Sequence, residues 1–224
     1  MACGWSVALG LWTAVSSSLA APGLSVPRAP SRLHVLVRVD VDRTVRDIAM
    51  TEVIDQIRDV WKPYLDVDFA EAADLVDAVY DDEVRLFVIG PSRAANAANP
   101  PALGWIMFPE PRRPNNVITV SAGAARNLME HSQWRGWHLL DSPRSIQKRF
   151  LNRAIGRSAA HELGHYLLRM PSHRLFGLMR AQMSPSDIME DGLGLFGLDA
   201  ADVASLEPHT WLAQAGSSNL KEKT

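Results

Sequence analysis

The hydrophobic pattern after residue 32 alternates between strand and helix periods. Apolar side chains occupy every second position of 33–41, which is typical of a half-buried strand. Residues 44–61 carry apolar side chains at helical spacing behind a Thr-x-x-Asp capping box, and Pro63 closes this helix. A second strand is predicted near 65–69, so the domain begins with a right-handed β-α-β unit.

Three further apolar segments extend the predicted sheet. Residues 84–89 are almost continuously apolar, as in a central strand that is covered on both faces. Residues 104–108 and 117–120 flank a proline-rich connector, which predicts antiparallel neighbours with one strand at the sheet edge. Residues 134–137 are predicted as a loop.

Helices dominate the second half of the chain. A helix is expected over 122–130 with Ser121 as its N-cap. A long helix has Ser142 as its expected N-cap and Pro143 at its first position, and it ends before Pro171. A last helix covers about 199–213. Strands first and helices afterwards predict an α+β fold with a mixed, twisted sheet.

The first 21 residues resemble an export signal. No charged side chain precedes Arg28, and the short apolar run 7–15 is followed by small residues. Cleavage is expected after Ala20 or Ala21, in a small-x-small pattern. Because the run is too short to span a bilayer stably, we expect a secreted or periplasmic protein. An uncleaved anchor and a misplaced start codon are the alternatives.

Composition restricts the class of protein. The 224 residues are 47% hydrophobic and 21% charged, which fits one globular domain (31–215) with a polar tail (216–224) and excludes disorder and collagen-like repeats. The net charge of −2 gives no attraction to nucleic acid or to anionic membranes. Cys3 is the one cysteine, so a thiolate metal site and a cysteine nucleophile are excluded.

The long helix carries the sequence His161-Glu162-Leu163-Gly164-His165. Histidines at i and i+4 lie one turn apart on the same face of a helix, so both imidazoles can reach one ion. Zinc binds such nitrogens and keeps an open position in catalytic sites, where a carboxylate such as that of Glu162 can take a proton from an activated water. The alternative is a helix with two ordinary surface histidines.

A third ligand is needed, and His173 is the preferred candidate. It follows His165 by eight residues, after Pro171 has forced the chain out of the helix. The rival donors are Asp187, Glu190, Asp191 and His209.

The segment from His161 to Met179 resembles the zincin metallopeptidases, and most closely their metzincin branch. The shared features are the His-Glu-x-x-His helix, a following histidine and a methionine turn. This resemblance implies Zn²⁺ as cofactor, with His161, His165 and His173 as ligands and Glu162 as general base. It also implies that Met179 or Met189 forms the turn beneath the metal.

The resemblance has a limit and a structural consequence. Metzincins have a glycine three residues after the second histidine and the third ligand three residues later, where this chain has Leu168 and Pro171. The exit turn must therefore be longer. The family fold implies an active-site helix, a small C-terminal helical subdomain and peptide binding along the edge strand 104–108.

These observations predict a secreted zinc metalloendopeptidase that hydrolyses peptide or protein substrates and is monomeric, without nucleic-acid partners or stable membrane insertion. Two alternatives remain open. One is a secreted binding module in which zinc only stabilises the fold, and the other is a zinc hydrolase of non-peptide amides.

Overall fold

The computed structural model describes residues 33–74, 76, 78–90 and 102–206. The expected signal (1–21), the polar tail (216–224) and the rival ligand His209 lie outside these ranges. Among the described residues, no helix combines the length and the apolar character needed to cross a bilayer.

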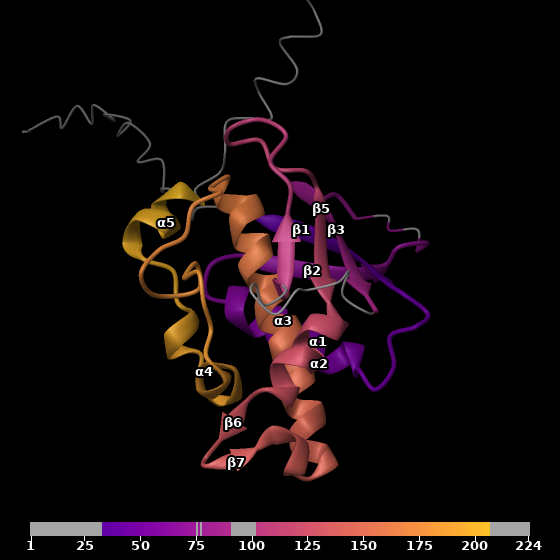
Figure 1. The fold of residues 1–224 in the computed structure, drawn as a ribbon. Helices are drawn as coiled ribbons and strands as arrows, with labels where there is room; N and C mark the ends of the chain where they lie inside the picture. The colour runs from indigo at the N-terminus through magenta and orange to yellow at the C-terminus, as the bar shows by residue number, and fades with distance from the viewer. Residues whose placement is uncertain (1–32, 75, 77, 91–101, 207–224) are drawn as a thin grey trace, which may run out of the picture. The chain divides into compact units, whose positions relative to one another are not determined.

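A five-stranded mixed sheet forms the centre of the domain (Figure 1). Its strand order is β2-β1-β3-β5-β4, and all neighbours are parallel except β4, which runs antiparallel to β5 at one edge. The mixed sheet with an antiparallel edge strand is therefore as predicted. The strands are β1 (His34–Val41), β2 (Asp66–Glu71), β3 (Asp82–Ile89), β4 (Gly104–Ile106) and β5 (Val117–Ser121).

Helix α1 (Met50–Trp61) connects β1 to its parallel neighbour β2, which confirms the predicted β-α-β unit. The predicted capping box is wrong, because Ala49 is the N-cap. The Thr44 hydroxyl instead donates to Asp42 Oδ1 at 2.7 Å, and Asp47 has a left-handed φ of 63°. A local turn thus uses the Thr44 side chain, and the helix starts later.

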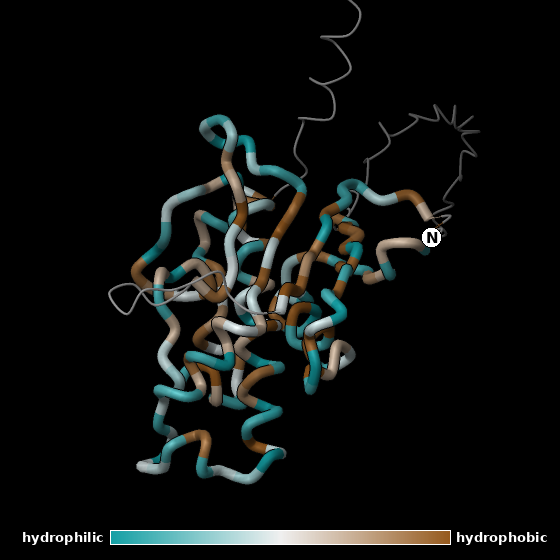
Figure 2. The backbone as a smooth tube through the Cα atoms, turned by 45° about the vertical axis from the view of Figure 1, so that its right-hand side comes forward, coloured by the Kyte–Doolittle hydropathy of each residue, from teal (hydrophilic) through white to brown (hydrophobic). Residues whose placement is uncertain are grey.

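The hydrophobic core lies between one face of the sheet and helices α1 and α3 (Arg144–Leu168). Figure 2 shows hydrophobic and hydrophilic stretches alternating along the backbone. Val84, Leu86 and Val88 of β3 are fully buried. Arg85 on the opposite face is exposed, however, so β3 is central but not covered on both faces as predicted.

Helix α2 (Ala122–Glu130) confirms the predicted bounds, and the Ser121 hydroxyl caps it by accepting from the amide of Ala124. The predicted loop at 134–137 is a short hairpin instead, β6 (Gln133–Trp134) and β7 (Trp137–His138). Its two turn residues, Arg135 and Gly136, have φ of 54° and 82°, as two-residue hairpin turns require.

Helix α3 runs beside the sheet and is followed by short helices (Figure 1). A 3-10 turn η1 (Leu139–Asp141) precedes α3, whose N-cap is Pro143 rather than Ser142. The segment after α3 contains α4 (Pro185–Met189), the 3-10 turn η2 (Gly194–Phe196) and α5 (Ala200–Ser205). In the described part of the chain, the five strands of the central sheet thus precede all helices except α1, in line with the prediction of strands first and helices afterwards. The described part of the last predicted helix ends at Ser205.

Candidate metal centre

The middle of α3 is buried, and this burial includes its polar side chains. Ala159, Ala160 and Leu163 are in the core, which places this part of the helix beneath the sheet. His161 and Glu162 are each only 7% exposed and His165 only 5%. These are not surface histidines, so the alternative of two ordinary solvated side chains is wrong.

Backbone carbonyl groups fix the tautomers of both helical histidines. His161 Nδ1 donates to the carbonyl oxygen of Leu178 at 2.7 Å, and His165 Nδ1 donates to that of Met170. Because a carbonyl oxygen only accepts, each Nδ1 must carry the hydrogen. Each neutral ring therefore presents an unprotonated Nε2, the form that binds a metal.

The two free nitrogens point at one another. His161 Nε2 and His165 Nε2 are 3.0 Å apart, and two lone pairs at this distance repel unless a cation lies between them. Two nitrogens bound tetrahedrally to one zinc at 2.0–2.1 Å would be about 3.3 Å apart. The observed separation is close to this value, so the pair fits a shared metal ion.

His173 joins this pair from the loop that follows α3. Ligand atoms of His161, His165 and His173 all lie within 4.8 Å of one another. The His173 ring stacks on that of His161, with centroids 5.3 Å apart, and meets that of His165 edge-on. In the described part of the chain this is the one group of three potential metal-ligating side chains.

The exit turn that brings His173 back is built on Arg169. This residue ends α3 in a left-handed conformation, with φ of 51°, one position after Leu168. The amide of Met170 then donates to the carbonyl of His165. The left-handed residue that ends the helix is therefore an arginine and not a glycine. It lies one position later than the glycine of the metzincin pattern.

Burial shifts the pKa values of the central groups. It lowers the pKa of His161 to about 4 and also lowers the pKa of His165, which keeps both rings neutral at pH 7. Burial raises the pKa of Glu162 to about 7. A buried carboxyl with such a pKa is suited to exchanging protons near neutral pH.

Glu162 lies directly beneath the edge strand β4. A Cβ added to Gly104 would be 3.0 Å from Glu162 Cγ and 2.6 Å from Ser158 Oγ. Only a residue without a side chain allows this approach between strand and helix. The first residue of the edge strand and the candidate general base are therefore in contact.

Met179 packs against the centre of the motif. A Cβ at Gly164 would overlap Met179 Sδ, and Gly164 lies between the two helical histidines in sequence. The Met179 side chain is buried, and its carbonyl accepts from the amide of Arg174 at 2.8 Å. Met189 is also buried, and its carbonyl accepts from Arg153.

The rival ligands have other roles. Asp187 completes the capping box of α4, whose N-cap is Ser184, and pairs with Arg180 at 3.2 Å. Asp191 pairs with Arg153 at 2.5 Å. Glu190 is the C-cap of α4. None of these three belongs to the histidine group.

Sequence reasoning missed the groups that hold the histidines. The acceptors are backbone carbonyls of Met170 and Leu178, which leave no trace in residue type. It also missed Asp202. The buried carboxylate of Asp202 pairs at 2.6 Å with Arg174, the residue that directly follows His173. An Arg adjacent to a ligand was the available signal, but its partner is 28 residues away.

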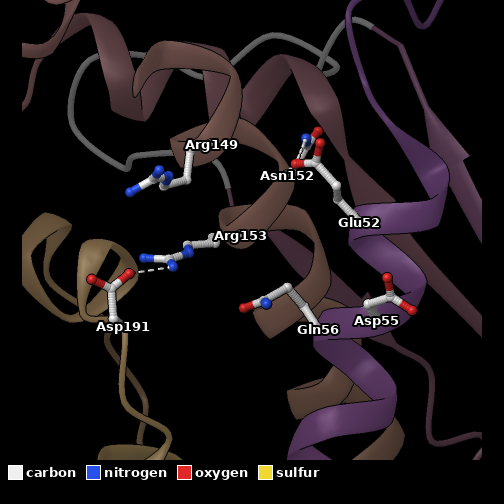
Figure 3. Close-up of a pocket in the computed structure, with 7 residues that line it drawn as sticks. All are labelled: Glu52, Asp55, Gln56, Arg149, Asn152, Arg153 and Asp191. Carbon is white, nitrogen blue, oxygen red and sulfur yellow. Dashed lines mark hydrogen bonds and ion pairs between the residues drawn. The ribbon is translucent and has the colours of Figure 1, made fainter. Parts of the chain in front are cut away.

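A separate polar cleft of about 500 Å³ lies between α1 and α3 (Figure 3). Four of its seven lining residues form two pairs: Asn152 donates to Glu52 at 2.6 Å, and Arg153 binds Asp191. No residue of the histidine group or Glu162 lines it. The cleft is therefore no part of the candidate centre.

Comparisons with known proteins give matches among solved structures alone. No protein-family model matches the chain, and no curated protein matches it. Among solved structures, the crystal structure of archaemetzincin from Methanopyrus kandleri is similar at 14% sequence identity, with a TM-score of 0.42. The alignment covers 81% of this chain and 96% of that chain.

Proposed function

We propose that the chain is a zinc-dependent peptidase in which His161, His165 and His173 hold the metal and Glu162 is the general base. The observation that carries this proposal is the 3.0 Å approach of two imidazole Nε2 atoms whose Nδ1 atoms both donate to carbonyls. Such a pair is satisfied by a cation. Three imidazole nitrogen donors without a thiolate are typical of catalytic zinc sites.

Zinc, when bound, supplies Lewis-acid polarisation of the substrate carbonyl and of a water. The role of the chain is proton transfer at the Glu162 carboxylate. This carboxylate takes a proton from the attacking water and returns it to the nitrogen of the leaving amine. Burial of Glu162, which raises its pKa to about 7, brings its proton affinity near that needed at neutral pH.

The open sheet edge supports a peptide as substrate. Strand β4 ends the strand order, so in the described part of the chain one side of it has no strand partner. An extended peptide can pair with such an edge through main-chain hydrogen bonds. Because Gly104 of β4 contacts Glu162, a peptide paired there passes beside the general base. A small non-peptide amide would gain nothing from this edge.

Metal analysis tests the metal centre. Purified wild-type protein should contain one zinc per chain, and His173→Ala should lose most of it. His138→Ala, at an exposed position outside the group, is the matched control and should keep its zinc. A wild type without zinc after reconstitution would refute the proposal.

Glu162→Ala separates catalysis from a structural metal. Hydrolysis of a casein substrate should fall by at least 10³-fold while zinc content stays near one per chain, because Glu162 moves a proton and holds no metal. If the wild type holds zinc, cleaves neither peptides nor amides, and unfolds when zinc is chelated, the zinc-stabilised binding module is correct instead. Activity on simple amides without cleavage of peptides would favour the amide hydrolase.

Export remains part of the proposal and rests on residues 1–21 alone. It predicts that the protein recovered from outside the cytoplasm begins at Ala21 or Pro22. N-terminal sequencing of that protein decides the matter, because an intact Met1 terminus would contradict cleavage.

A further inference from the structure

Two large apolar side chains project into solvent immediately after the candidate ligand His173. Leu175 is 87% exposed and Phe176 is 82% exposed; together they are called the apolar tip here. Adjacent apolar residues with this exposure are unfavourable in water, and such patches mark contact sites for other molecules.

The turn that carries the apolar tip is fixed on both sides. The amide of Arg174 donates to the carbonyl of Met179 at 2.8 Å, and the amide of Leu178 donates to that of Gly197 at 3.0 Å. Gly177 has a φ of +77°, and a Cβ there would overlap the Gly197 carbonyl oxygen. The backbone around the tip is therefore preorganised, which lowers the entropy lost when a partner binds.

The position of the apolar tip points to the substrate as its partner. Three residues of chain separate the Cα atoms of His173 and Phe176 by at most about 11 Å. His173 is itself exposed, so the metal centre is reached from solvent on the side of this ligand. A peptide that reaches the centre along this side comes within side-chain reach of the tip.

The charges around the tip argue against a lipid surface. Surface segments that bind membranes combine apolar side chains with unpaired Lys and Arg. Here Arg174 is paired with Asp202 and Asp199, and Arg180 is paired with Asp187. Among the described residues, the two arginines that flank the tip are thus both balanced by carboxylates.

We infer that Leu175 and Phe176 form the subsite for a large apolar side chain of the peptide substrate, close to the bond that is cleaved. This inference rests on the proposed function and deepens it, since it names the substrate class. A leucine or phenylalanine of the peptide packs on the tip, and both partners remove apolar surface from water.

Peptide binding by zinc-loaded Glu162→Ala protein tests the inference without turnover. The probes are fluorescein-labelled, capped alanine octapeptides with Leu, Phe, Ser or Asp at one central position, measured by fluorescence anisotropy. The Leu and Phe peptides should bind about tenfold tighter than the Ser peptide. In Leu175→Ser/Phe176→Ser protein this advantage should fall below about twofold.

Two variants keep the test specific. Phe176→Leu retains an apolar side chain and should preserve the advantage. Trp137→Ser removes another exposed apolar residue, 71% exposed, and should change nothing. Trp137 precedes the start of α3, which is separated from His161 by 17 helical residues, about 25 Å.

Several results would overturn the inference. One is an advantage of the Leu and Phe peptides that survives in the double variant. Another is binding to phosphatidylserine–phosphatidylcholine vesicles, or dimerisation in sedimentation, that the double variant abolishes. A wild type without zinc would remove the proposed function and the inference together. A wild type that holds zinc and cleaves peptides without apolar preference would remove the inference alone.

Discussion

The guanidinium of Arg174 and the carboxylate of Asp202 form an ion pair of 2.6 Å. This pair joins the loop that carries His173 to helix α5. The Asp202 side chain is only 4% exposed, and this pair raises the pKa of Arg174. Since Arg174 directly follows His173, the pair restrains the one ligand that α3 does not hold. A C-terminal element thus positions a residue of the metal centre.

Asp202→Asn should weaken zinc binding by about tenfold, because loss of a group that orients a ligand costs 10- to 100-fold in metal affinity. The shape of the side chain is kept, and the charge partner of Arg174 is lost. Competition with a zinc-chelating dye measures the dissociation constant.

Asp199→Asn is the matched control for this prediction. Asp199 lies 3.7 Å from Arg174 Nε and caps α5 through its side chain, and asparagine caps helices equally well. Its zinc affinity should stay within about twofold of wild type. Equal losses in both variants would show that α5 affects the centre only through general stability.

The turn that contains Gly177, four residues after His173, should not tolerate a side chain at that glycine. Positive φ costs a non-glycine residue about 1–2 kcal/mol, and overlap with the Gly197 carbonyl adds about 1–3 kcal/mol. Gly177→Ala should therefore lower the free energy of unfolding by about 3 kcal/mol. It should also weaken zinc binding, since the neighbouring Leu178 carbonyl orients His161.

Gly136→Ala separates the cost of the positive φ from the cost of the steric overlap. Gly136 has a similar φ of +82°, but no atom lies within 4 Å of the added Cβ. Urea unfolding should show a loss of only about 1 kcal/mol there. Equal losses of unfolding free energy at the two positions would mean that the overlap of the added Cβ at residue 177 with the Gly197 carbonyl costs nothing.

Several elements were predictable because local chemistry determines them. The Ser121 hydroxyl caps α2, as serine side chains favour. The proline-rich connector correctly predicted an antiparallel pair at the sheet edge. The helical spacing of His161 and His165 placed two imidazoles together without any tertiary information. Such features depend on residues within a few positions of one another.

The remaining features depend on contacts that are distant in sequence. The start of α1 is an exception, because there a local contact, from the Thr44 hydroxyl to Asp42 two residues earlier, replaces the predicted cap. Phe87 and Ile89 suggested a strand covered on both faces, but covering depends on what packs there, and Arg85 is exposed. The support of His173 comes from Asp202, which no local pattern connects to it.

The contact between Gly164 and Met179 predicts a reversal of sign. In the wild type, Gly164→Ala should destabilise the protein by about 1–2 kcal/mol, because overlap with Met179 Sδ outweighs the better helix propensity of alanine. In a Met179→Ala background the overlap is gone, and Gly164→Ala should stabilise by about 1 kcal/mol. Urea unfolding of the four proteins of this cycle measures the coupling. Additive effects would show that Met179 does not pack against the motif.

The ion pair between Asp187 and Arg180 predicts a stability difference that depends on pH. Burial alone would raise the pKa of Asp187, but hydrogen bonds from the Ser184 hydroxyl and amide and the Arg180 charge hold it below its ordinary 3.8. Because the pKa is lower in the folded state than in the unfolded chain, the carboxylate stabilises the folded protein fully at pH values above its ordinary pKa of 3.8. This stabilisation is lost as the pH falls through the lower folded pKa.

Asp187→Asn keeps an acceptor for the Ser184 amide and removes only the charge. Wild type should therefore be more stable than the variant at pH 6, and the difference should shrink progressively below about pH 4. Urea unfolding of metal-free protein at pH 6, 5, 4 and 3 measures it, since protonation of the histidines affects both proteins alike. A difference that stays constant down to pH 3 would mean that the charge of Asp187 contributes nothing to the attachment of α4.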